Sequence, residues 1–248
     1  MNGFTRNMFV SALLAGGVGL AMTARAADVD LEKGQSSRWN GELEFGYVKT
    51  TGNTDIENII LKAKAVNERP RWTHELRFSG LRNEDSGTTT AKNATLQGDT
   101  QYKWSERSYV FGTGRYEKDD FAGYDYRAVG VAGLGHKVLW EKRYHLELEA
   151  GAGGRRTAYI DKPDASEGIG RLAGKFFWQI SDTAQFTTEL YMEAGDDNTV
   201  TDSLSELKVK VIGHLAVKMS VRATHNTDVP PDTDKTDVRT AFTAVYDF

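Results

Sequence analysis

Residues 93–104 read Asn-Ala-Thr-Leu-Gln-Gly-Asp-Thr-Gln-Tyr-Lys-Trp, and strongly polar side chains alternate with less polar ones along the whole stretch. Successive side chains of a β-strand point to opposite faces, so this alternation predicts a strand with one polar and one apolar face. The same period of two recurs at 72–79, 145–152, 171–180 and 238–248. From Trp39 onward we count twelve such stretches with hardly any helical spacing between them, which indicates an all-β protein.

The connections between these stretches alternate strictly in length. We expect short turns at 69–71, 105–107, 140–143, 181–183 and 213–214. We expect longer polar connections at 50–55, 84–92, 117–125, 158–167, 195–202 and 226–236. Six long and five short connections require twelve strands with both chain ends on the short-turn side. This is the arrangement of a transmembrane antiparallel β-barrel with short periplasmic turns and long extracellular loops.

The composition excludes several other classes of protein. The chain has 248 residues, with 25 Gly, 4 Pro and no Cys, so it has neither disulfides nor a thiolate zinc site. Beyond residue 22 no stretch approaches the roughly 20 continuous apolar residues that a membrane helix requires. A barrel is still allowed, because its apolar residues occur only at every second position.

The first 26 residues have the features of a secretory signal peptide. Arg6 precedes an uncharged run over 9–22, and Ala24-Arg25-Ala26 predicts cleavage after Ala26. Loss of this segment, which carries two Arg and no acid, leaves 29 basic and 35 acidic residues, a net charge of −6. That charge disfavours a nucleic-acid partner. We expect 27–37 to be a periplasmic lead-in and 38–248 to be the barrel.

Large aromatic residues cluster beside the short turns. They are Trp72, Tyr102, Trp104, Tyr109, Trp140, Tyr144, Trp178 and Phe186. Aromatic rings form such girdles at the membrane–water interface. The alternative is a soluble β-sandwich or periplasmic binding barrel with aromatics inside, but the strand centres, rich in Gly and Ala, would make a thin core. We interpret these glycines as room for aromatic or long lumen side chains.

The chain ends with Phe242-Thr-Ala-Val-Tyr-Asp-Phe248. Phe242, Tyr246 and Phe248 lie on one strand face, which resembles the terminal assembly signal of outer-membrane barrels. The resemblance implies the barrel assembly machinery and periplasmic chaperones as partners during biogenesis. We expect outer-membrane lipids and lipopolysaccharide to surround the assembled protein.

Nearly all of 38–248 resembles the YdiY-like salt-induced outer membrane proteins. The resemblance rests on the first strand, Trp39-Asn-Gly-Glu-Leu-Glu-Phe-Gly-Tyr47, on Thr51-Gly-Asn-Thr54, on the glycine-rich sixth and seventh strands and on 237–248. It implies a barrel in a Gram-negative outer membrane. The family has no established activity, so the resemblance transfers no functional residues.

The alternation also assigns charged side chains to the lumen, since each costs roughly 2–4 kcal/mol when it faces lipid at the midplane. The candidate lumen-lining residues are Glu42, Glu44, Lys62, Lys64, Glu75, Arg77, Asp99, Lys103, Arg127, Glu147, Glu149, Arg171, Lys175, Glu189, Arg222 and Arg239. Both signs occur in comparable number. This pattern is typical of a small water-filled pore for ions or small solutes, or of a non-conducting structural or adhesive barrel whose lumen is filled by salt bridges.

An outer-membrane hydrolase is the remaining alternative. Its best candidates are His145 and Glu147, two residues apart on one strand face, a spacing that is common by chance. The sequence contains no Gly-x-Ser-x-Gly, His-Glu-x-x-His or Walker motif. Its acidic loops lack the spacing of a calcium loop. We therefore predict no catalytic activity, no cofactor and no specific metal site, with loose bridging of divalent cations to lipopolysaccharide as a hypothesis for the acidic loops.

Overall fold

The computed structural model describes residues 39–50, 56–161, 163–229 and 234–248. The predicted signal peptide with its cleavage at Ala26, the lead-in 27–37 and the Thr51–Thr54 motif lie outside the described residues. In the described part of the chain no helix is long and apolar enough to cross a membrane.

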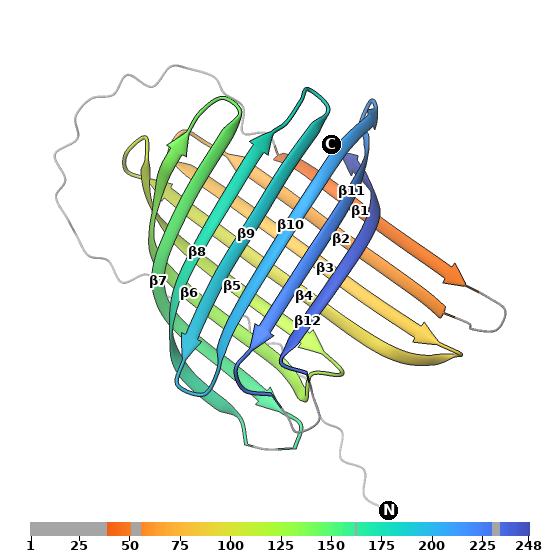
Figure 1. Ribbon diagram of the computed structural model, residues 1–248. Helices are drawn as coiled ribbons and strands as arrows, with labels where there is room; N and C mark the ends of the chain where they lie inside the picture. Colours follow the sequence, from red (N-terminus) through yellow and green to blue (C-terminus); the bar gives the residue numbers. More distant parts are fainter. Residues whose placement is uncertain (1–38, 51–55, 162, 230–233) are drawn as a thin grey trace, which may run out of the picture. The chain divides into compact units, whose positions relative to one another are not determined.

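The described chain forms one closed antiparallel barrel (Figure 1). Its strands are β1 (Trp39–Thr50), β2 (Ile56–Glu68), β3 (Trp72–Asp85), β4 (Thr88–Lys103), β5 (Ser108–Asp119), β6 (Tyr124–Trp140), β7 (Tyr144–Tyr159), β8 (Ala165–Gln179), β9 (Ala184–Gly195), β10 (Thr199–Ile212), β11 (Leu215–Asn226) and β12 (Thr236–Asp247). Each strand pairs with the next, and β12 pairs with β1 between Glu42 and Phe45. Closure pairs the two edge strands over this short segment, which satisfies backbone groups that a membrane-spanning sheet could not leave exposed to lipid. The predicted twelve-stranded antiparallel barrel is confirmed.

The period of two sorts side chains between the two faces of the wall. In β4, Leu96 lies opposite Phe78 and Tyr116 on the neighbouring strands. The next residue, Gln97, lies opposite Arg77 and Arg115. Apolar side chains therefore meet on one face and polar side chains on the other, as the alternation predicts.

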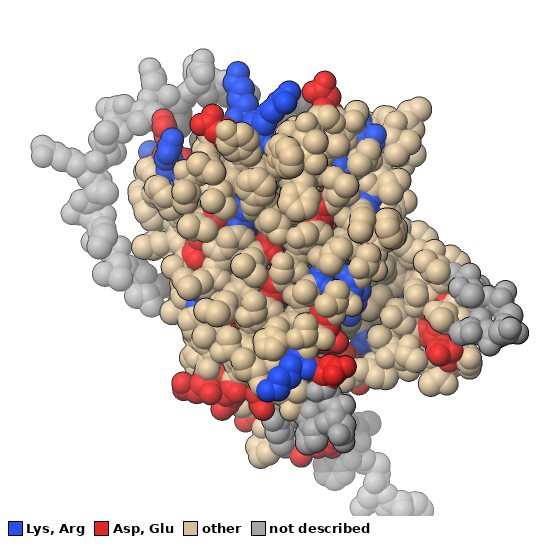
Figure 2. All heavy atoms as spheres, in the orientation of Figure 1, with Lys and Arg blue, Asp and Glu red and all other residues tan. Residues whose placement is uncertain are grey.

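The distribution of polarity is the reverse of that in a soluble protein. Among the described residues, fifteen polar or charged side chains are buried, against twelve apolar ones. Leu148, Leu172 and Phe242 are 49%, 56% and 65% exposed. Figure 2 shows a wall that is mostly uncharged, with charged side chains protruding chiefly at its two rims. A soluble protein buries such apolar residues, whereas a membrane barrel exposes them to lipid.

The expected long connections are shorter than predicted, because the strands continue into them. Only Ser86 and Gly87 join β3 to β4, where a loop over 84–92 was expected. Their φ angles of 51° and 79° form a tight two-residue hairpin turn. Similarly, only 120–123 join β5 to β6 and 196–198 join β9 to β10. Beyond the membrane a strand loses its apolar face, so apolar alternation underestimates its length.

Among the predicted girdle residues, Tyr109 and Trp140 contact interior side chains, although Trp140 remains 45% exposed. Tyr109 is fully buried in the interior. A bulge between Lys137 and Leu139 shifts the register of β6. Trp140 then packs against His145, with 4.1 Å between ring centroids, and lies under the Lys137 ammonium. Local alternation cannot reveal such a shift.

Candidate functional site

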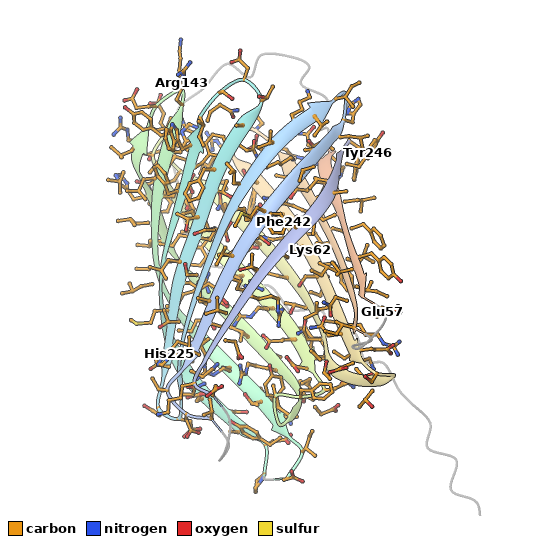
Figure 3. The ribbon with its side chains drawn as sticks, turned by 45° about the vertical axis from the view of Figure 1, so that its right-hand side comes forward. Glu57, Lys62, Arg143, His225, Phe242 and Tyr246 are labelled. Carbon is orange, nitrogen blue, oxygen red and sulfur yellow. The ribbon has the colours of Figure 1, made fainter. Side chains whose placement is uncertain are left out.

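The barrel encloses a polar cavity of about 560 Å³. Its lining begins at the level of Arg77 and Glu189 and reaches the connection residues Phe121, Asp228 and Asp234. No described residue of the five short turns lines it. In Figure 3, Arg143 marks the short-turn rim and His225 lies near the opposite rim. The cavity therefore lies in the half of the lumen away from the short turns. The connections between β5 and β6 and between β11 and β12 lie at the rim of that half.

One ion pair spans the lumen at the inner end of this cavity. Arg77 Nη1 lies 2.9 Å from Glu189 Oε2. Their strands, β3 and β9, lie six positions apart around the ring of twelve, so the pair joins opposite walls. Glu75 and Asp99 also contact the Arg77 guanidinium. This bridge crosses the lumen, and we refer to its level as the constriction.

A second cluster surrounds Glu193, whose side chain is fully buried. Its carboxylate lies 2.7 Å from Arg115 Nη2 and 2.6 Å from Arg171 Nη1. The Tyr191 ring stacks on both guanidinium groups, at 5.2 and 4.4 Å. The single carboxylate holds two cations against one side of the lumen.

A third cluster involves strands on both sides of the β1–β12 closure. Lys218 Nζ lies 2.7 Å from Glu42 and 2.6 Å from Glu44. Lys62 lies 3.3 Å from Glu44 and 3.7 Å from Glu206. These contacts connect β1 and β2 to β10 and β11 through the interior. Charges of both signs are thus compensated near the constriction.

Aromatic rings fill the interior beside β6 and β7. The Tyr109 hydroxyl donates to Glu147 at 2.7 Å and to Glu149 at 3.0 Å. Gly135 lies directly under the Tyr109 ring, where a Cβ would overlap it. Gly133 and Gly151 similarly leave room for Phe111. The interpretation of glycines as space for large lumen side chains therefore holds for these three, whereas a Cβ at Gly114 or Gly130 would meet nothing within 4 Å.

One residue ties together two connections at the cavity mouth. The Asn198 Oδ1 atom accepts hydrogen bonds from the backbone N–H groups of Thr227 and Asp228, both at 3.0 Å. Its Nδ2 donates to Asn226 at 3.0 Å. These bonds join the β9–β10 connection to the start of the β11–β12 connection. The mouth is therefore braced by hydrogen bonds on this side.

The sixteen predicted lumen residues all lie on the interior face. Nine line the cavity: Glu42, Glu44, Lys62, Lys64, Arg77, Arg127, Glu189, Arg222 and Arg239. Six contact other interior side chains: Glu75, Asp99, Glu147, Glu149, Arg171 and Lys175. Lys103 lies opposite Tyr109 in the strand register.

The prediction omitted several interior charges. They are Arg115, Asp202, Glu206, Lys208 and Lys218. The same alternation could have identified them. For example, Lys218 and Arg222 are four residues apart on one strand and therefore lie on the same face.

The two hydrolase candidates do not form a dyad. No hydrogen bond joins His145 to Glu147 among the described contacts. The His145 ring stacks on Phe177, and its Nδ1 is buried without a hydrogen-bond partner. Glu147 instead accepts from Tyr109. Among the described residues, no three His, Asp or Glu side chains gather as a metal-binding group.

Comparison with known proteins shows a family and a shared fold. Residues 43–248 match the family described as "Protein of unknown function, DUF481". The chain is 25% identical over 240 residues to "Uncharacterized protein YdiY" of Escherichia coli (strain K12), covering 94% of this chain and 95% of the relative. The NanC porin superposes with a TM-score of 0.53 and 10% identity, covering 83% of this chain and 98% of that one. An outer membrane channel from Pseudomonas putida F1 gives 0.50 and 12%, covering 90% and 100%. At these identities the two structures share only their fold with this chain, that of an outer-membrane barrel.

Proposed function

Because this chain belongs to the DUF481 family of proteins of unknown function, we propose a function from its interior: it is a small pore for ions and small solutes in the outer membrane. The cavity of about 560 Å³ carries the proposal. Charged side chains of both signs line it, and a lumen filled throughout by side chains would contain no such space. The porin and the channel that share its fold support the same function.

The proposed conduction path narrows where Arg77 meets Glu189. An ion that passes this point must displace the pair or slip beside it. The lining carries charges of both signs, and opposite charges on facing walls produce an electric field across the pore. We therefore expect low conductance with weak selectivity between small anions and cations.

A non-conducting structural or adhesive barrel is the second candidate. The bridge between opposite walls favours it, because an ion pair that stays closed would seal the lumen. In both cases lipids and lipopolysaccharide are the proposed surroundings. Phe242, Tyr246 and Phe248 form the proposed signal for the assembly machinery.

Single-channel conductance in planar bilayers separates the two candidates. We expect the double variant Arg77→Ala/Glu189→Ala to conduct severalfold better than wild type, because both walls lose the side chains that meet at the constriction. Removing both partners together leaves neither of them as a lone buried charge. Asp99 loses its contact with Arg77 but keeps hydrogen bonds from Gln97 and Thr113.

The matched control is Arg156→Ala/Asp164→Ala, which removes an exposed ion pair of 3.2 Å. Its conductance should equal that of wild type. Absence of current in both wild type and the Arg77/Glu189 variant would contradict the pore and leave the structural barrel.

A further inference from the structure

Charge compensation is uneven along the cavity. Near the constriction, Glu42, Lys62, Arg77 and Glu189 all take part in ion pairs. Toward the opposite rim the pairing is incomplete. Among the described residues, no carboxylate lies within 4.0 Å of the guanidinium of Arg127 or Arg239, and both side chains line the cavity.

The surroundings of Arg127 explain why it has no carboxylate partner. Glu117 lies directly opposite it on the neighbouring strand. However, the Tyr124 hydroxyl donates to Glu117, and Arg115 Nε lies 3.8 Å from the same carboxylate. Arg127 instead stacks on the Tyr124 ring at 4.4 Å, and its Nε is buried without a hydrogen-bond partner. The ring holds the guanidinium without neutralising it.

A second pair of cations lies on β11 and β12. Arg222 and Arg239 are directly opposite each other in the strand register. Like charges in this position repel. Asp202 lies 3.3 Å from Arg222 Nε and also accepts from Thr224 at 2.7 Å. That carboxylate contacts Arg222, whereas among the described residues Arg239 has no carboxylate within 4.0 Å.

Two further acids of the same region, Asp119 and Asp237, attract Arg239 only from beyond ion-pair distance. Asp119 accepts from the backbone N–H of Phe121 at 3.0 Å. Asp237 lies two residues before Arg239 and also lines the cavity. Neither forms an ion pair within 4.0 Å among the described residues. Their negative charge disfavours a polyanion, so the region is suited to a ligand with a single anionic group.

We propose that Arg222 and Arg239, with Arg127 on the opposite wall of the same cavity, form a binding site for a small solute that carries one oxyanion group, a carboxylate or a phosphate. The guanidinium fork matches both groups and donates two hydrogen bonds to each. An anion between Arg222 and Arg239 also offsets their mutual repulsion. This inference names the class of solute for the proposed pore, and the biological role of the site rests on that proposed function. Binding itself requires only that the cavity be open at this rim.

Isothermal titration of the refolded barrel in detergent tests this site. The probes are sodium phosphate and sodium acetate, each at an ionic strength held constant with NaCl. We expect wild type to bind at least one probe, and Arg239→Gln and Arg127→Gln each to weaken that binding about tenfold, the effect of losing a charged hydrogen bond. Glutamine keeps much of the side-chain volume, and Arg239 is exposed, so its replacement should not impair folding.

Arg156→Gln is the matched control, since it removes an exposed arginine that pairs with Asp164 and does not line the cavity. Its affinity should equal that of wild type. Three outcomes would overturn the site: no binding of either probe to wild type, unchanged affinity in Arg239→Gln, or an equal loss in Arg156→Gln. A barrel that binds phosphate without conducting contradicts the pore alone, and one that conducts without binding either probe contradicts the site alone.

Discussion

Replacement of Gly153 by alanine should destabilise the barrel by more than about 3 kcal/mol and sharply lower the fraction that assembles. Gly153 lies on the interior face of β7, opposite Val131 of β6. A Cβ there would overlap the carbonyl oxygen of Gly130 and lie 2.7 Å from the Val131 Cα. Both are backbone atoms of the paired strand, so they can move only by disturbing the ladder. Gly133 and Gly151 are under the same constraint, so β6 and β7, at the left edge of the barrel in Figure 1, approach each other closely at three glycines.

The adjacent residue supplies the control. Gly154 lies on the opposite face, and a Cβ there would meet only the Glu167 carbonyl oxygen at 3.6 Å, an ordinary contact. We therefore expect Gly154→Ala to fold as wild type does. Urea titration in lipid vesicles, together with the mobility of unheated protein on gels, compares the two variants. If Gly153→Ala and Gly154→Ala are equally stable, the close approach of Gly153 to the β6 backbone does not determine the stability of the barrel.

Replacement of Glu193 by alanine should lower the free energy of unfolding by about 3–5 kcal/mol, the usual effect of removing one member of a buried ion pair. Glu193 is the fully buried carboxylate that holds Arg115 and Arg171. Without it, Arg171 has no carboxylate within 4.0 Å among the described residues, and Arg115 keeps only Glu117, at 3.8 Å. Urea titration measures the loss.

Two further variants separate charge from volume. Glu193→Gln keeps the shape and removes the charge, so it should lose most of the same free energy. Asp164→Ala breaks the exposed pair with Arg156 and should cost less than about 1 kcal/mol. If Glu193→Gln is as stable as wild type, the electrostatic explanation is wrong.

Much of the wall was predictable from local pattern. The faces of β3, β4, β7, β8 and β12 follow from alternation alone, because a strand turns each side chain by half a turn relative to the last. The pattern was insufficient where the register shifts, as at the bulge before Trp140. It was also insufficient beyond the membrane, where β4 begins at Thr88 without an apolar face.

For the interior, the sequence predicted which charged residues face the lumen but not which of them contact each other. Alternation placed Arg77 and Glu189 in the lumen, but 112 residues separate them in the chain. Nothing local indicates that β3 and β9 face each other at the same height. The same limit applies to Glu193, which takes one partner from β5 and one from β8.

The amino-acid sequence by itself determined the number of strands, their antiparallel order and the side of the wall on which each charge lies, since these depend on neighbours along the chain and on the cost of charge in lipid. Only the tertiary structure decided which charges meet. The stagger of a closed barrel sets the relative heights of side chains on distant strands. It therefore brings Arg77 to Glu189. Among the described residues it leaves no carboxylate within 4.0 Å of Arg127 or Arg239.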